Sequence, residues 1–329
     1  KGTTSHSLIS VLGSVLKTEL TPPVSTARAL ESEKLIRDFK RWPNLEHNSG
    51  RFAIRCDREN INILMGKAEE VDGIVQAVEW KSLGSAPAVI DGLEEGTYMV
   101  RVSDQRVEFT APMKMPRVGD TTVDVPFSIV ANVPDNFRAI FANTAVVGGD
   151  NSAFWSMPRQ DVQIQTFAMA RTPVTFGAYI LFLNAIAAHD INTALKRCPR
   201  TESSRLIACV NETFSLPRIS PFESTWDRDW PVFGISWDDA KAYCEWMGHQ
   251  DGRSYRLPAS VEWEVAARGV DERIFPWGNI WEPSFSNNAL EQPGSPRLTS
   301  VGNHPTDMSP YGVMDMAGGV AEWTSTELE

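Results

Sequence analysis

Residues 311–324 read YGVMDMAGGVAEWT, the most specific pattern in this chain of 329 residues. Three further patterns precede it in order: RTPVTF at 171–176, PVFGISWDDA at 231–240, and YRLPASVEWE at 255–264 with FPWGN at 275–279. All of them combine aromatic residues with Gly, Pro and Asn and have little helical or strand periodicity. They therefore predict a domain of loops and short strands, fastened by buried aromatic side chains, backbone hydrogen bonds or metal.

The same part of the chain also contains a few helices. Ser236 is placed to cap a helix over 237–247, whose apolar residues fall on one face. Ser260 is placed to cap a second helix that ends at residue 268, and a third is expected over 175–188. Nine of the eleven tryptophans follow residue 150, so this region must have an aromatic-rich core.

Together, the four ordered patterns resemble the formylglycine-generating enzyme (sulfatase-modifying factor) family, whose domain is a variant of the C-type lectin fold. The resemblance implies an α+β, C-type lectin-like domain over residues 136–329. Within that superfamily, the stretch 158–179 is most similar to domains attached to bacterial serine/threonine kinases. The same fold also carries the variable proteins of diversity-generating retroelements.

Two smaller segments precede this domain. Residues 1–46 are expected to form a helical arm or linker, with a helix that begins after Ser25 and stops at Pro43. Residues 47–135 contain short runs of β-branched and aromatic residues separated by turn residues, which predicts a small β-sandwich. The hairpin at 91–102 resembles immunoglobulin-like or PEGA-type sandwiches of bacterial signalling proteins.

Composition narrows the classes of partner. Lysine and arginine number 31 against 42 acidic residues, which gives a net charge of −11. Without a basic block, neither nucleic acid nor anionic lipid is an expected partner. The longest apolar stretches, at 8–16 and 178–188, are shorter than the ~20 residues of a spanning helix. The four cysteines show no C-x-x-C spacing, which argues against a zinc site and a redox motif. A soluble cytoplasmic protein with free thiols is expected.

No catalytic residue is predicted. Family members that make formylglycine bind copper through two cysteines, which follow the Glu-Trp-Thr motif and an Arg-Gly-Gly-Ser-Trp string. None of the cysteines here lies beyond Trp323, and the domain is expected to be C-terminally incomplete. Cys244 falls on the apolar face of a predicted helix and is interpreted as a core residue. The histidines are scattered, which argues against the iron site of another family branch.

The resemblance also implies calcium, which the family binds through side-chain and carbonyl oxygens. Asn287, with the carbonyl of Asn288, matches one calcium site, and Glu322 matches a ligand of the other. The asparagine usual beside the second site is Gly319 here, which removes an amide oxygen. The alternative is that Asn287, Asp315 and Glu322 simply bond loop backbone.

A candidate ligand-binding surface lies in a short acidic string. Exposed tryptophan beside charge is typical of surfaces that recognise partners. The alternatives are a carboxylate pair in a cleft and a surface loop in which arginine neutralises its neighbours. The residues concerned are Trp226, Asp227, Arg228, Asp229 and Trp230, with Trp323 of the C-terminal motif added as a further candidate.

The leading hypothesis is a non-catalytic ligand-binding or sensory module of a larger bacterial signalling or defence protein. Its ligand would be a protein or small molecule, and a kinase domain in the same polypeptide is a candidate partner. A second hypothesis is a copper-dependent oxidase of peptidyl cysteine that lacks its catalytic segment here. A third is a retroelement-diversified binding protein. Calcium is the cofactor expected under the first hypothesis, and copper belongs to the second alone.

Overall fold

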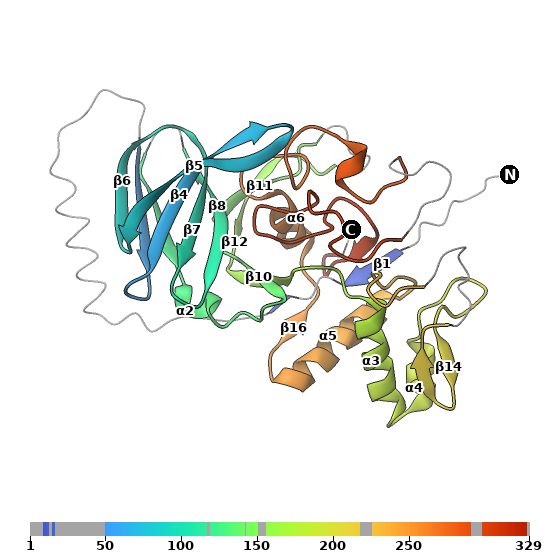
Figure 1. Ribbon diagram of the computed structural model, residues 1–329. Helices are drawn as coiled ribbons and strands as arrows, with labels where there is room; N and C mark the ends of the chain where they lie inside the picture. Colours follow the sequence, from blue (N-terminus) through green and yellow to red (C-terminus); the bar gives the residue numbers. More distant parts are fainter. Residues whose placement is uncertain are drawn as a thin grey trace.

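A β-sandwich and an α+β domain make up the part of the chain that the computed structural model describes (Figure 1). The described residues are 9–12, 15–16, 50–116, 119–141, 143–150, 156–217, 226–290 and 298–327.

The sandwich consists of two sheets, with strand orders β6-β3-β9 and β5-β4-β7-β8. Burial alternates along its strands: Tyr98, Val100 and Val102 are buried, whereas the residues between them are partly exposed. Such alternation places one face of each sheet in a common core. The elements of this part are β3 (Gly50–Cys56), β4 (Asn62–Val71), β5 (Ile74–Ser85), β6 (Ala88–Leu93), β7 (Gly96–Ser103), β8 (Glu108–Met115), β9 (Thr121–Val125) and the short helix α2 (Phe127–Val130).

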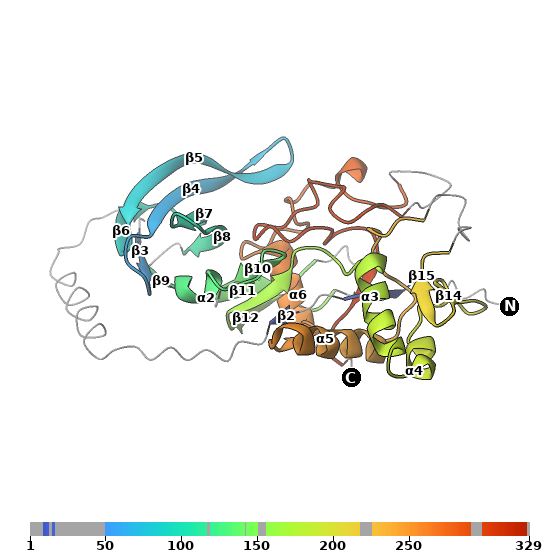
Figure 2. The ribbon, with the colours of Figure 1, turned by 60° about the horizontal axis from the view of Figure 1, so that its bottom comes forward.

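The α+β domain has short strands and four helices among its described residues, connected by long loops. Its largest sheet has the order β10-β13-β2-β16. Helices α3 and α5 lie side by side in Figure 1 and Figure 2, with the rings of Tyr179 and Tyr243 in contact. The elements are β10 (Phe137–Ile140), β11 (Asn143–Val147), β12 (Gln160–Ile164), β13 (Phe167–Ala170), α3 (Phe176–Ala187), α4 (Ile191–Lys196), β14 (Ala208–Val210), β15 (Thr213–Ser215), α5 (Trp237–Asp251), β16 (Tyr255–Arg256), α6 (Ser260–Arg268), the 3₁₀ turn η1 (Pro283–Phe285) and β17 (Ala321–Trp323).

Helix α5 begins as its sequence predicts. The Ser236 hydroxyl accepts a bond from the Asp239 N–H, and the Asp239 carboxylate accepts one from the Ser236 N–H, which completes a capping box. Helix α6 differs from the prediction, because Ser260 is its first helical residue rather than its cap. Instead, the Glu262 carboxylate accepts a bond from the Ala259 N–H at 2.7 Å.

The described part of the N-terminal segment is strand rather than helix. Strand β1 (Ile9–Leu12) pairs in parallel with β17, and β2 (Val15–Leu16) lies between β13 and β16. The helical expectation is therefore wrong for these two stretches, which complete sheets of the α+β domain. The helix expected between Ser25 and Pro43 lies outside the described residues.

The sandwich packs directly against the α+β domain. One hydrophobic cluster contains Phe52 and Val100 of the sandwich together with Val265 of α6 and Tyr311. Across the joint, the Val75 N–H donates to the Trp277 carbonyl at 2.6 Å. The sandwich therefore shares a hydrophobic core with the following domain.

The Glu272 carboxylate adds an ionic contact at this joint. It meets Lys114 of β8 at 3.1 Å and Arg159 at 2.8 Å. The Arg159 hydrogen bond, with help from Lys114 and against partial burial, lowers the pKa of Glu272 to about 2. The carboxylate is therefore held in its charged form at the contact between the two parts of the chain.

Candidate functional site

Residues 299–302 connect the two sites that the sequence predicts. The Asn287 side-chain amide donates to Thr299 Oγ1 at 3.1 Å, and Ser300 Oγ donates to Asp227 Oδ2 at 3.0 Å. Further along, the Gly302 N–H donates to Asp315 Oδ2 at 2.7 Å. The predicted metal ligand Asn287 and the predicted binding string around Asp227 therefore belong to one cluster of loops.

A small cavity lies within this loop cluster. Its lining includes Asn287, Asp307, Asp315 and Gly319, and its volume is about 10 Å³. A cavity needs about 10–15 Å³ to hold one water molecule, so there is room for one water-sized occupant. The oxygen atoms around this cavity belong to carboxylate, amide and backbone carbonyl groups, which suit a hard cation such as calcium as ligands.

Three acidic residues of this cluster have raised pKa values. Burial raises the pKa of Asp307 to about 7, although its carboxylate accepts a bond from the Ala317 N–H at 2.9 Å. Burial likewise raises the pKa of Asp315. Burial raises the pKa of Glu322 to about 8, and the charges of the two aspartates add to the effect. Burial therefore disfavours the charged forms of these carboxyl groups, and a bound cation would favour them.

The local contacts of the predicted ligands are mostly to loop atoms. Glu322 accepts a bond from the Trp263 indole at 3.0 Å. Asn288 donates from its side chain to the Pro283 carbonyl at 2.7 Å and accepts from the Leu290 N–H at 2.9 Å. In the described stretches, no three His, Cys, Asp or Glu side chains meet as a metal-binding group. A cation here would therefore need amide and carbonyl oxygens as well.

Two glycines bring the loops close together. A Cβ on Gly318 would lie 2.6 Å from the Asn287 carbonyl oxygen, closer than such atoms approach. Gly319 has a φ of +86° and donates its N–H to the same carbonyl at 2.8 Å. The Gly-Gly pair that replaces the family's usual Gly-Asn therefore fastens residues 318–319 to Asn287.

The structure corrects the expectation that the tryptophans of the acidic string are exposed. Trp226 and Trp230 are only 8% and 6% exposed, and the Trp226 ring lies 5.0 Å from that of Phe176. Asp227 and Asp229 are exposed, and the Asp229 N–H donates to Asp227 Oδ1 at 2.9 Å. The expectation of exposed tryptophans is wrong because flanking charges do not reveal which way a side chain packs.

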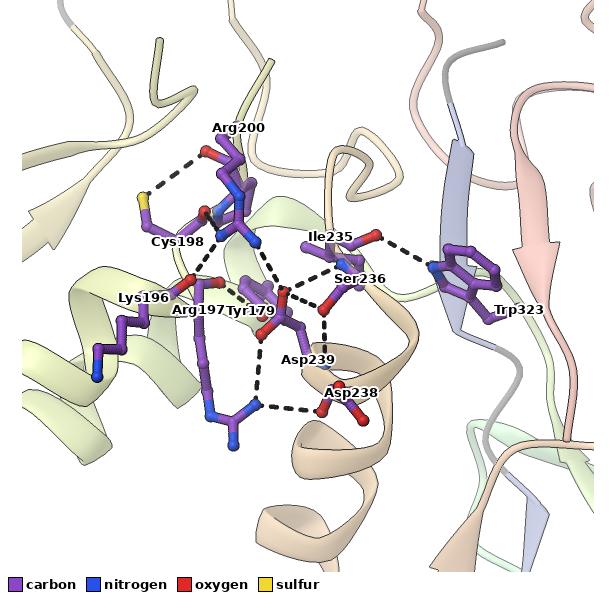
Figure 3. A network of polar contacts seen from close by, with 11 residues as sticks. Tyr179, Lys196, Arg197, Cys198, Arg200, Ile235, Ser236, Asp238, Asp239 and Trp323 are labelled. Atoms are coloured by element: carbon purple, nitrogen blue, oxygen red, sulfur yellow. Dashed lines mark hydrogen bonds and ion pairs between the residues drawn. The ribbon is translucent and has the colours of Figure 1, made fainter. Parts of the chain in front are cut away.

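The remaining members of the string and of the C-terminal motif also have defined positions. Arg228 is exposed, and its carbonyl accepts a bond from the Gly177 N–H at 2.8 Å, which holds the string against α3. Trp323 is half-buried and donates from its indole to the Ile235 carbonyl at 3.1 Å (Figure 3). Its indole is thus bonded to the residue that precedes the capping box of α5.

Asp239 is the centre of the polar network drawn in Figure 3. Its carboxylate accepts bonds from the Ser236 N–H at 3.0 Å and the Ser236 hydroxyl at 2.7 Å. It also lies 3.3 Å from the Arg197 guanidinium and 4.0 Å from that of Arg200. This buried carboxylate therefore connects the start of α5 to the end of α4.

The cysteines lie apart from the loop cluster, and all four are free thiols. Burial raises the pKa of Cys244 to about 12 and that of Cys198 to about 11. Cys56 belongs to β3 of the sandwich and Cys209 to β14. The two buried thiols are therefore neutral and unreactive near neutral pH.

Sequence reasoning missed Asp307 as a member of the cluster. Asp315 lies in the quoted C-terminal pattern, where the sequence indicates only a residue that bonds loop backbone. Asp307 has no local pattern, and its place follows from the tertiary contact with Ala317.

Comparison with known families agrees with the resemblance in the sequence. The model of the sulfatase-modifying factor enzyme 1-like domain matches residues 136–329, more than half of the chain. The chain therefore belongs to this family, that of the formylglycine-generating enzymes and their relatives. Among the described residues, no helix has the length and apolar character to cross a membrane.

Individual relatives cover smaller parts of the chain. It is 34% identical over 110 residues to the inactive C-alpha-formylglycine-generating enzyme 2 of Bos taurus, which covers 31% of this chain and 34% of the relative. It is 38% identical over 107 residues to the formylglycine-generating enzyme of the same species, covering 30% and 27%. It is 39% identical over 94 residues to serine/threonine-protein kinase pkn1 of Chlamydia pneumoniae, covering 28% and 13%. The chain thus spans about a third or less of the length of these curated relatives.

A solved structure of PvdO from Pseudomonas aeruginosa is also similar. It covers 59% of this chain and 78% of that chain, with 18% identity and a TM-score of 0.41.

Proposed function

We propose that this chain is a non-catalytic ligand-recognition module of a larger signalling protein. The observation that carries the proposal is the state of the thiols. The formylglycine chemistry of the family needs two reactive cysteines on copper, whereas Cys198 and Cys244 are buried and neutral. Cys56 and Cys209 belong to strands of separate sheets.

The curated relatives include a protein named as inactive as well as a named enzyme. One bovine relative is named as inactive and another as the enzyme itself, at 34% and 38% identity. The matching region of a bacterial serine/threonine kinase supports a role beside an effector domain in the same polypeptide. We infer that residues 136–329 of this chain have the C-type lectin-like arrangement, because their short strands and helices α3 and α5 are joined by long loops.

Calcium is proposed as a structural cation of the loop cluster. Asn287 and Asp315 line the same cavity, and Glu322 lies near enough to the Asp315 charge to be affected by it. Oxygen ligands of these types are those that calcium prefers. When bound, the cation would neutralise carboxylates that burial otherwise destabilises, and would hold residue 287 against the loop at 315–322.

An oxygen-consumption assay tests the non-catalytic proposal. Purified protein is incubated with copper(I) and a cysteine-containing peptide, and the peptide is examined by mass spectrometry. We expect neither oxygen uptake above the copper blank nor formylglycine. Turnover that disappears in Cys244→Ser but persists in the matched variant Cys56→Ser would overturn the proposal in favour of the oxidase.

A further inference from the structure

A second and larger cavity lies away from the loop cluster, between α5, β16 and Ser325. Its volume is about 240 Å³. Its lining includes Cys244, Tyr255 and Leu257, which are only 1%, 7% and 3% exposed. Because the buried Cys244 thiol is neutral, this part of the lining behaves as an apolar surface.

The walls of this cavity are fixed by hydrogen bonds. The Trp237 indole donates to the Thr324 carbonyl at 2.9 Å, and the Ser325 N–H donates to the Pro258 carbonyl at 2.7 Å. Arg256 forms two bonds of 2.7 Å to the Glu262 carboxylate, so its charge is already balanced. A ligand would therefore enter a preformed site, with little ordering of the protein.

Two opposite charges on α5 flank the cavity without pairing to each other. Lys241 and Glu245 are exposed, line the cavity and lie one helical turn apart, a spacing at which such residues often form an ion pair. Among the ion pairs of the described residues, none joins them. Instead, the Lys241 ammonium lies 5.6 Å from the centroid of the Trp237 ring. The cavity therefore combines an apolar interior with one cationic and one anionic group.

We propose that this cavity binds a free α-amino acid with an apolar side chain. The ligand carboxylate would meet the Lys241 ammonium, the ligand ammonium would meet the Glu245 carboxylate, and the side chain would pack on Leu257. Pockets for drug-sized ligands measure about 300–1,000 Å³, so this smaller cavity suits a ligand the size of one amino acid. The inference rests on the proposed recognition function and supplies a ligand class for it.

The expected affinity is modest. Exposed ion pairs contribute little, so most of the binding free energy must come from burying the apolar side chain. For a ligand of roughly a dozen heavy atoms, the expected Kd lies between about 2 mM and tens of micromolar.

Calorimetric titration with three related probes tests the proposal. The probes are L-phenylalanine, phenethylamine, which lacks the carboxylate, and 3-phenylpropionate, which lacks the ammonium. On the wild-type protein, we expect each analogue to bind several-fold more weakly than phenylalanine. Lys241→Met should remove the preference for phenylalanine over phenethylamine, and Glu245→Gln the preference over 3-phenylpropionate. Lys81→Met, an exposed lysine of β5, is the matched control and should leave all three affinities unchanged.

Two results would overturn the inference. One is the absence of saturable binding by phenylalanine at about ten times the weakest expected Kd. The other is binding whose preference among the probes is unaffected by both charge substitutions, which would place the ligand elsewhere. Either result would leave the recognition function standing, because that function is overturned separately by turnover in the oxygen-consumption assay.

Discussion

Substitution of Asp239 should destabilise the protein far more than substitution of its neighbour Asp238. Both aspartates lie in the first turn of α5, where either charge interacts favourably with the helix dipole. The Asp238 side chain is exposed, whereas the Asp239 side chain is only 7% exposed. The pair therefore separates the effect of the buried network from that of a charge at a helix start.

The magnitude follows from the contacts that Asp239→Ala removes. Loss of its half of the capping box costs about 1 kcal/mol. Removing one partner of a buried ion pair costs about 3–5 kcal/mol, but Arg197 and Arg200 are 29% and 49% exposed and can be rehydrated. We therefore expect a total loss of about 2–4 kcal/mol. For Asp238→Ala we expect less than about 1 kcal/mol.

Equilibrium unfolding in urea, followed by tryptophan fluorescence and far-UV circular dichroism, measures both losses. Asp239→Asn should be intermediate, because an amide oxygen can still accept the bond from the Ser236 N–H but carries no charge for the two arginines. Equal losses for Asp238→Ala and Asp239→Ala would refute the reasoning, since the network of Figure 3 would then contribute nothing beyond the helix start.

Three further predictions concern the joint and the loop cluster. The pKa of Glu272 falls from 4.5 to about 2 on folding, so its charged form stabilises the fold fully above pH 4.5, and this stabilisation is lost as pH falls toward 2. Glu272→Gln should therefore lower the urea midpoint at pH 6 and have a smaller effect near pH 3. Gly318→Ala should destabilise by about 2 kcal/mol or more because its Cβ would collide with backbone, whereas Gly319→Ala, with open space but a φ of +86°, should cost about 1 kcal/mol in the same unfolding assay. Calcium should raise the thermal midpoint of the wild-type protein in a concentration-dependent way, and Asn287→Ala or Asp315→Ala should abolish the shift; an unchanged wild-type midpoint at millimolar calcium would contradict the cation site.

Local sequence patterns correctly predict those features of the fold that depend on residues close together in the sequence. The capping box at Ser236 and Asp239 is an interaction over three residues, so the start of α5 could be read directly. The four ordered patterns led to the family because their order and spacing are specific to it.

Tertiary contacts decided the features that the sequence did not reveal. Trp226 and Trp230 are flanked by charges yet pack inward, because Trp226 contacts Phe176 of α3 and Phe233, and Trp230 contacts Trp226. Strand β2 completes a sheet with partners more than a hundred residues away, which a local propensity for helix cannot anticipate. Asp307 joins the carboxylate cluster only through the fold of its loop.

Copper(I) retention tests the central claim, that this chain provides no reactive pair of thiols. The protein is loaded with copper(I) under anaerobic conditions, passed over a desalting column in the presence of a competing copper(I) chelator, and its metal content is measured. The account predicts that no stoichiometric copper remains, because Cys198 and Cys244 are buried as neutral thiols and thiolates are the form that binds metal. One copper per chain, lost on Cys244→Ser, would contradict it.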